Sequence, residues 1–165
     1  LYPERVQGLL LSGPAISGYR YTGQPHPLSA AIEAAENAGD LARVCELELQ
    51  MWVDGAGRKP QNVDPDVRQL VYDMNWIALN GDEDLWEGEQ DLEPPALGRL
   101  ADMDKPTLII IGDLDVAASI ERADLLATEV RAAQKVVMSG TAHLLNMEQP
   151  QRFNQIITAF LSAQP

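Results

Sequence analysis

The chain has 165 residues, 45% of them hydrophobic, which is enough for a single domain with a buried core. Its net charge of −13 argues against nucleic-acid and anionic-membrane partners, because binding to phosphates depends on Lys and Arg, and no apolar run is long enough to span a bilayer. A single cysteine cannot form an intrachain disulfide, so nothing indicates an oxidising compartment and we expect a cytoplasmic protein.

The first predicted element is a strand. Val6–Leu11 is almost continuously apolar, a pattern typical of an interior strand that is paired at both edges and covered on both faces. Gly13 and Pro14 follow, and the proline ring cannot donate a ladder hydrogen bond. We therefore expect the strand to end there.

Helical patterns dominate the chain from about residue 18 to residue 98. The expected helices are Leu28–Ala38, Leu41–Val53 and Val67–Leu79. Asp64 is the expected N-cap of the third, with Pro65 at its first helical position. Cys45 lies among apolar positions of the second, which favours a buried core position over a reactive thiol.

Three tryptophans supply large apolar groups in this helical section: Trp52, Trp76 and Trp86. Packing of the helices onto the core would explain each of them, and the alternative is an apolar roof over a ligand pocket. Trp76 and Trp86 are our candidates for lining such a pocket. The acidic run Asp82–Asp91 lacks the spacing of a calcium loop, so we interpret it as a solvated loop rather than a metal site.

Two predicted buried strands near the C-terminus each end in a turn that carries a titratable side chain. Leu108–Ile111 is a short apolar run closed by Gly112, and Asp115 follows it. The next run is Val136–Met138, after which a Ser-Gly-Thr-Ala turn leads to His143. Open parallel sheets place their chemistry at the carboxyl ends of the strands, so we expect this acid and this base at one edge. The other expected helices are Ala96–Met103, Ala118–Val130 and Gln151–Ser162.

These turns resemble those of the α/β-hydrolase family. The family's acid lies in a Gly-x-x-Asp turn, matched by Gly112 and Asp115, and its histidine lies in a Gly-x-x-His turn, matched by Gly140 and His143. The opening segment, residues 2–14, is similar to the family's sixth strand with its lead-in. The resemblance covers essentially the whole chain.

The resemblance implies an α/β fold: the C-terminal part of an α/β-hydrolase, with parallel sheet strands flanked by helices and an inserted helical cap. It divides the chain into a core strand and exit loop (1–17), the helical cap (18–98) and a C-terminal core that carries the acid and histidine turns (99–165). It also implies that His143 is the catalytic base and Asp115 the acid that orients it. Asp113 competes for the acid's role, but matching the turn favours Asp115, and we expect Asp113 to be exposed or to cap the following helix.

The family's nucleophile lies on a Gly-x-Ser-x-Gly elbow upstream of the sixth strand. None of the six serines here is flanked in this way. We therefore expect the nucleophile to lie outside this chain, and the chain alone to be inactive. The N-terminal portion of the same fold, or a second copy pairing along the edge of Val6–Leu11, is the expected partner.

The resemblance implies Ser-Asp-His acyl transfer on a small, apolar carboxylic ester or lactone. No cofactor or metal is expected, because no His, Cys or Asp cluster has ligand spacing and no Gly-rich phosphate loop is present. Two alternatives stay open: a non-catalytic ligand-binding module of the same fold, and an interaction module that is stable only with a partner chain. The sequence does not indicate which ester is cleaved, or the oligomeric state.

Overall fold

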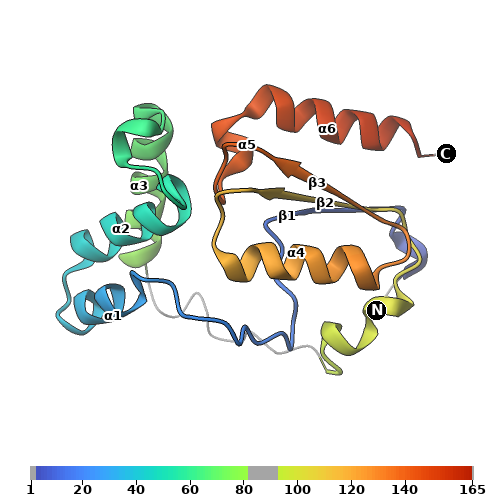
Figure 1. Ribbon diagram of the computed structural model, residues 1–165, viewed down its shortest axis with the longest axis horizontal. Helices are drawn as coiled ribbons and strands as arrows, with labels where there is room; N and C mark the ends of the chain where they lie inside the picture. Colours follow the sequence, from blue (N-terminus) through green and yellow to red (C-terminus); the bar gives the residue numbers. More distant parts are fainter. Residues whose placement is uncertain (1–2, 82–92, 165) are drawn as a thin grey trace.

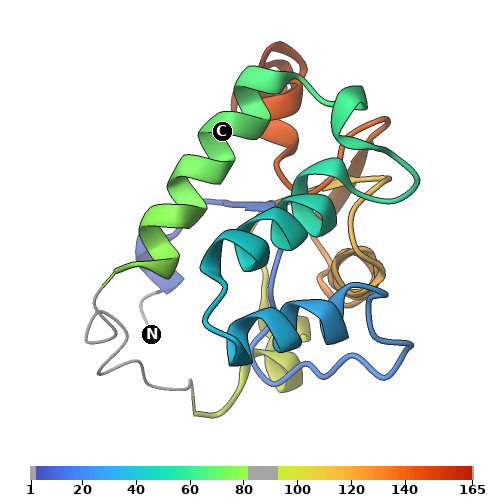
Figure 2. The same cartoon turned by 90° about the vertical axis from the view of Figure 1, so that its left-hand side faces the viewer.

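The computed structural model describes residues 3–81 and 93–164. Trp86 and the acidic run from 82 to 91 lie outside these residues. The described part has two regions, a parallel sheet with helices on both faces and a group of helices set against the ends of its strands (Figure 1). Figure 2 views the molecule from the side of this second group, the cap. Within the described ranges, no helix is long and apolar enough to cross a membrane.

The sheet has three parallel strands in the order β1-β2-β3: β1 Leu9–Ser12, β2 Thr107–Gly112 and β3 Ala133–Met138. All six residues of β2 are buried, as its continuous apolar pattern predicts. Ile109 and Ile111 pack on the side of α4 (Ala117–Glu129), and Leu108 and Ile110 pack on the side of α6 (Pro150–Ser162). This alternation places one helix on each face of the sheet (Figure 1).

The predicted interior strand Val6–Leu11 is corrected in position and in burial. The strand begins at Leu9 and ends at Ser12, and its residues alternate between half-buried and exposed. Leu10 is 43% exposed and Val6 36% exposed. Among the described residues β1 pairs only with β2, so its other edge is open. Its apolar pattern indicates a strand that is covered on both faces, but among the described residues only one face is covered: Leu11 packs against the core on the side of α4, whereas Leu10, on the other face, stays exposed.

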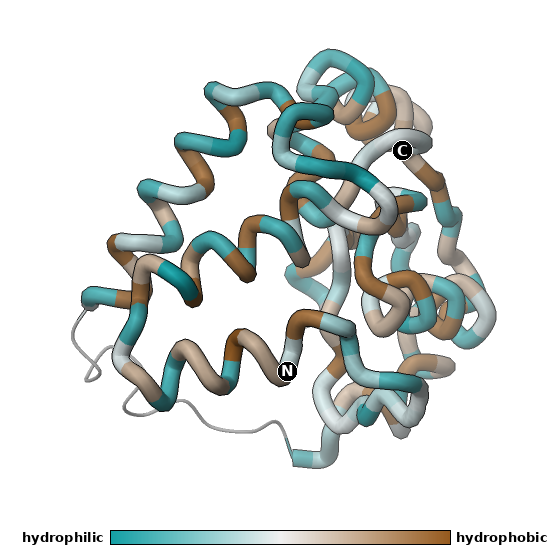
Figure 3. The backbone as a smooth tube through the Cα atoms, turned by 60° about the vertical axis from the view of Figure 1, so that its left-hand side comes forward, coloured by the Kyte–Doolittle hydropathy of each residue, from teal (hydrophilic) through white to brown (hydrophobic). Residues whose placement is uncertain are grey.

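The described part of the cap contains three α-helices and short helical turns. Their bounds are α1 Ser29–Asn37, α2 Leu41–Leu49, the π-helical turn η2 Gln50–Asp54, the 3₁₀ turn η3 Pro60–Asn62 and α3 Pro65–Leu79. The Asp64 side chain accepts hydrogen bonds from the Asp66 and Val67 amides, and Pro65 is the first helical residue. This confirms Asp64 as the predicted N-cap residue of α3. Cys45 is buried in the cap core, as expected. Apolar positions recur along each cap helix in Figure 3.

The predicted helix Leu41–Val53 differs from the structure at its end. Regular α-helix stops at Leu49, and the chain continues as the wider π-helical turn to Asp54. Gly55, at φ +70°, then turns the chain toward the sheet, where a Cβ would lie 2.6 Å from the Leu114 carbonyl oxygen. π-Helical turns are rare and are often found at functional sites.

The remaining elements of the described residues are the 3₁₀ helix η5 Ala96–Asp102, the short η1 Pro3–Arg5 and α5 Leu145–Glu148.

Candidate active site

Asp115 and His143 meet at the carboxyl ends of β2 and β3. His143 Nδ1 lies 2.8 Å from Asp115 Oδ2, which is hydrogen-bonding distance. The Asp115 side chain is fully buried, whereas that of His143 is 31% exposed. The predicted contact between the two side chains is therefore present, with the acid inside and the imidazole at the surface.

Asp115 is held so that one oxygen faces the histidine. Its Oδ1 accepts a 2.7 Å hydrogen bond from the Val116 amide, which leaves Oδ2 for His143. A carboxylate only accepts hydrogen bonds, so Nδ1 of the ring carries the hydrogen. In the neutral imidazole this leaves a lone pair on Nε2, the nitrogen that faces away from Asp115. His143, held by Asp115, can therefore accept a proton at Nε2.

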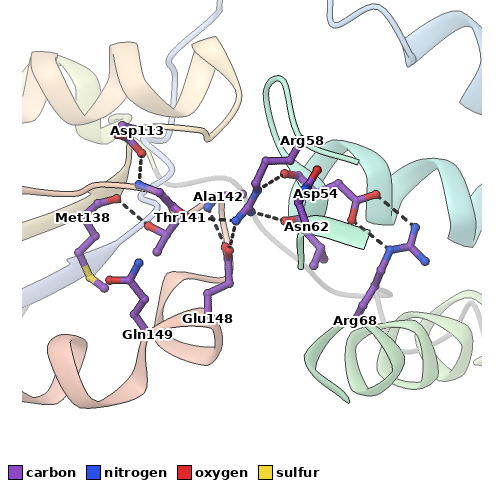
Figure 4. Close-up of polar contacts among 12 residues, drawn as sticks. Asp54, Arg58, Asn62, Arg68, Asp113, Met138, Thr141, Ala142, Glu148 and Gln149 are labelled. Atoms are coloured by element: carbon purple, nitrogen blue, oxygen red, sulfur yellow. Dashed lines mark hydrogen bonds and ion pairs between the residues drawn. The ribbon is translucent and has the colours of Figure 1, made fainter. Parts of the chain in front are cut away.

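Asp113 does not compete with Asp115 for the histidine. Of the two alternatives expected for Asp113, exposure is confirmed, because the residue is exposed. The other is wrong, because the N-cap residue of α4 is Val116. Asp113 Oδ1 instead accepts a 2.7 Å hydrogen bond from the Gly140 amide, as Figure 4 shows. Asp113 therefore joins the acid turn, residues 112–115, to the histidine turn, residues 140–143.

The two turns are packed backbone against backbone. The Leu114 amide donates to the Thr141 carbonyl at 3.0 Å. At Gly112 a Cβ would lie only 2.2 Å from the Thr141 carbonyl oxygen, so no other residue fits without moving the histidine turn. This close approach explains the glycine of the Gly-x-x-Asp pattern by packing rather than by a special backbone angle.

The cap loop, residues 52–58, touches both turns. The His143 amide donates to the Trp52 carbonyl at 3.1 Å, and the Ala56 amide donates to the Leu114 carbonyl at 2.9 Å. Sequence reasoning missed this loop, because its first two residues lie in the predicted helix Leu41–Val53 and the rest is a polar stretch with no periodic signal. Three segments that are far apart in the sequence thus form one junction around His143.

Trp52, rather than Trp76, is the tryptophan beside the histidine. The Trp52 and His143 rings lie 4.8 Å apart between centroids, at 56°. Trp76 is 39% exposed, stacks on Tyr72 and is not among the residues that line the cavity next to His143. Trp86, the other candidate, lies outside the described residues. A stripe of apolar positions on α3 does not indicate which of its side chains faces the sheet.

The cavity next to His143 has a volume of about 410 Å³. Its lining is mostly apolar, with Glu48 and Asn75 as its polar members besides the histidine. The apolar residues are Leu49, Trp52, Val53, Val71, Met74, Ala78 and Leu144. Asn75 Nδ2 donates to Glu48 Oε2 at 2.7 Å, so these two polar groups satisfy each other. In the part of the chain that the structure describes, no group of three His, Cys, Asp or Glu side chains could hold a metal ion.

Gly13, which follows β1, lies directly against the imidazole ring of His143. Its φ is +52°, and a Cβ there would lie 2.7 Å from His143 Cε1. We expect Gly13→Ala to displace the ring and weaken its hydrogen bond to Asp115, observed by NMR as loss of the hydrogen-bonded Nδ1 proton signal. Gly39→Ala is the matched control, because Gly39 has a similar φ of +67° but no atom within 4 Å of its Cβ position. An unchanged His143 signal in Gly13→Ala would contradict this assignment.

Comparison with known proteins gives structural but not sequence relatives. No family model matches the sequence, and no curated protein is significantly similar to it. Among solved structures, the 2-hydroxy-6-oxo-6-phenylhexa-2,4-dienoate hydrolase from Rhodococcus sp. strain RHA1 matches with a TM-score of 0.71 at 17% identity, over 98% of this chain and 57% of that one. An esterase from Rhodococcus sp. ECU1013 matches with a TM-score of 0.71 at 15% identity, over 96% of this chain and 57% of that one.

A third structure, Est816, described as an N-acyl homoserine lactone degrading enzyme, matches with a TM-score of 0.64 at 20% identity. That match covers 96% of this chain and 60% of Est816. The chain therefore spans less than two thirds of the length of these structures. The match takes in almost all of this chain, including its three-stranded parallel sheet and the helices that flank it. The chain has the α/β-hydrolase fold and corresponds to the C-terminal part of it.

Proposed function

We propose that this chain supplies the acid and the base of a serine-type α/β-hydrolase that cleaves a small carboxylic ester or lactone. The observation that carries the proposal is the 2.8 Å hydrogen bond between His143 Nδ1 and the buried Asp115 carboxylate. A fully buried carboxylate that orients a partly exposed imidazole is the arrangement that a general base requires. The similarity to esterases and to a lactone-degrading enzyme agrees with this class of substrate.

The proposed chemistry is acyl transfer to water. A serine hydroxyl attacks the ester carbonyl while Nε2 of His143 takes its proton, and the imidazolium then protonates the leaving alcohol oxygen as the carbon–oxygen bond breaks. Asp115 holds the tautomer and stabilises the imidazolium. In the second half His143 takes a proton from water, which attacks the acyl-enzyme, and returns that proton to the serine. The scheme requires no metal or cofactor.

The nucleophile is proposed to come from outside this chain. Among the described residues, no serine or cysteine side chain makes a hydrogen bond to His143 Nε2. Cys45 lies in the cap core, where burial raises the pKa of its thiol, which disfavours the reactive thiolate. The oxyanion-hole donors are proposed to come from the same missing portion, because the family takes one of them from the residue after the nucleophile.

The cavity beside His143 supports a small, apolar substrate. Its volume of about 410 Å³ lies within the roughly 300–1,000 Å³ of small-molecule sites, and most of its wall is aliphatic or aromatic. Cap residues contribute most of this wall, while the turn after β3 contributes His143 and Leu144. We therefore propose that the cap selects the acyl or alcohol group and that the strand-end turns act on the ester.

The isolated chain is expected to hydrolyse p-nitrophenyl butyrate no faster than buffer, apart from a weak histidine-dependent background. The reason is that a general base without a nucleophile and oxyanion donors has little to act on. The measurement is ester hydrolysis together with titration by a fluorophosphonate. Stoichiometric labelling of one of the chain's serines would contradict the proposal.

The upstream coding sequence provides the decisive test of the function. If it encodes a Gly-x-Ser-x-Gly elbow, the protein carrying both parts should hydrolyse small esters, and His143→Gln should lower its kcat by about 10²–10⁴-fold. A protein with the elbow whose esterase activity survived His143→Gln would refute the proposed mechanism.

The second candidate function is a non-catalytic binding module. It is favoured by the apolar cavity beside His143, for which the described residues provide no nucleophile. Replacement of the elbow's serine would support it.

We also propose that β1 pairs with further polypeptide, either the N-terminal portion of the same fold or a second copy. Its open edge and the exposed Leu10 border a groove of about 1040 Å³ that Phe160 and Leu161 also line. Unpaired apolar strand edges promote association. We expect sedimentation of the 165-residue chain to show self-association or a bound partner. A dilute, cooperatively melting monomer would contradict this proposal.

A further inference from the structure

Arg58, in the cap loop, binds the histidine turn directly. Its guanidinium donates at 3.0 Å to the Gly140 carbonyl, the first residue of that turn. It also donates to two carbonyls of its own loop, those of Asp54 at 2.6 Å and Val53 at 2.7 Å, which hold the guanidinium in place (Figure 4). The planar fork of an arginine can satisfy several acceptors at once in this way.

Glu148 connects Arg58 to a second point of the histidine turn, the Ala142 amide. Arg58 Nη1 lies 2.6 Å from Glu148 Oε2, and Glu148 Oε1 accepts a 2.7 Å hydrogen bond from the Ala142 amide. Ala142 precedes His143, so Arg58 and Glu148 together fix both Gly140 and Ala142 (Figure 4). The side chains of the pair are only 15% and 6% exposed, which strengthens their mutual attraction.

The neighbouring Arg68 shows what a purely structural ion pair of the cap looks like. Its Nε lies 3.0 Å from Asp54 Oδ1, and its Nη2 lies 2.7 Å from Glu46 Oε1. Its side chain is 17% exposed, close to the value for Arg58, yet its partners all belong to the cap. The two arginines therefore differ in what they bind rather than in how deeply they lie.

We infer that Arg58 is a positioning residue. Acting through Gly140 and Glu148, it holds the histidine turn in the orientation that directs His143 toward Asp115, and it links that orientation to the docking of the cap. The catalytic consequence rests on the proposed function, but the effect on the imidazole does not. The prediction can therefore be tested on the chain without any hydrolytic activity.

The experiment uses ¹⁵N NMR of the imidazole rings to compare three test and control variants with the wild type, and a fourth variant to assign the signals. The chain has two histidines, so His26→Gln assigns the His143 signals. Arg58→Lys keeps the charge opposite Glu148 but loses the planar fork. Arg68→Lys is the matched control, because it perturbs a similarly buried arginine that does not touch the histidine turn. Glu148→Gln is a second test, since it keeps an acceptor for the Ala142 amide and removes the charge that binds Arg58.

In spectra recorded at a pH where the imidazole is neutral, we expect the wild-type chain and Arg68→Lys to show one protonated and one unprotonated nitrogen in His143, with a hydrogen-bonded Nδ1 proton. Arg58→Lys should lose that proton signal and average the two nitrogen shifts, and Glu148→Gln should do so in part. Unchanged His143 spectra in a folded Arg58→Lys chain would overturn the inference. If Arg58→Lys does not fold, an unchanged spectrum in Glu148→Gln would overturn it equally.

Activity separates this inference from the proposed function. In a protein that carries both this chain and a nucleophile, Arg58→Lys should lower kcat while KM changes little, because the cavity wall is intact. If Arg58→Lys changes the imidazole spectrum but the wild-type protein that carries both this chain and the nucleophile has no hydrolytic activity, the positioning role is supported and the proposed function is refuted. Equal spectral changes in Arg58→Lys and Arg68→Lys would instead show that Arg58 acts only through the stability of the cap.

Discussion

Gly112→Ala is expected to remove a large share of the folding stability of the chain. A Cβ at this position would lie 2.2 Å from the Thr141 carbonyl oxygen and 2.4 Å from that of Ala142. Both atoms are backbone, and Asp113, Arg58 and Glu148 hold that turn in place. Overpacking typically costs about 1–3 kcal/mol and occasionally more. We expect a loss in the upper part of that range, because neither turn can yield.

Urea-induced unfolding, followed by circular dichroism, measures this loss as a lower midpoint. Gly98→Ala is the matched control, because the Cβ position of Gly98 has no atom within 4 Å and its φ is not positive. We expect that variant to be as stable as the wild type or slightly more stable. Equal midpoints for the two variants would show that the acid and histidine turns can separate at little cost. That result would also weaken the argument that they position His143 rigidly.

Arg68→Met is expected to destabilise the cap by about 3–5 kcal/mol, the range for breaking a buried ion pair. Asp54 is only 2% exposed, and its carboxylate oxygens lie 3.0 and 3.3 Å from Arg68. Without the guanidinium, Asp54 would be a buried and uncompensated charge. The measurement is again urea unfolding. Lys135→Met is the control, because Lys135 pairs with the exposed Asp124 and surface pairs contribute about 0–1 kcal/mol.

Arg68 also controls an acid-dependent part of the stability through Glu46. The hydrogen bond from Arg68 lowers the pKa of Glu46 in the folded chain. A lowered folded pKa means that this contribution is present above the unfolded pKa and is lost as the pH falls through the folded one. Arg68→Met should therefore flatten the stability profile in this acidic window. An unchanged midpoint and an unchanged profile would show that Arg68 is dispensable.

The sequence by itself determined the elements and chemistry that depend on near neighbours in the chain. The apolar run of β2, the Asp64-Pro65 helix start and the positive φ of Gly140 each act within a few residues. Parallel strands bring their carboxyl ends to one edge, so two such local turns were enough to predict the contact between the acid and the histidine. The α/β-hydrolase fold was predicted from the resemblance of these turns, and of the opening segment, to those of the family.

Only the tertiary structure decided which distant segments surround that pair. Arg58 and Glu148 are 90 residues apart, and nothing in the spacing of a polar loop and a short helix indicates that they meet. Trp52 rather than Trp76 lies against His143 because the π-helical turn and Gly55 direct the cap loop onto the sheet. The half-exposed β1 differs from its interior pattern for a related reason. A strand's apolar pattern records that it needs covering, whereas burial depends on which other segments pack against it.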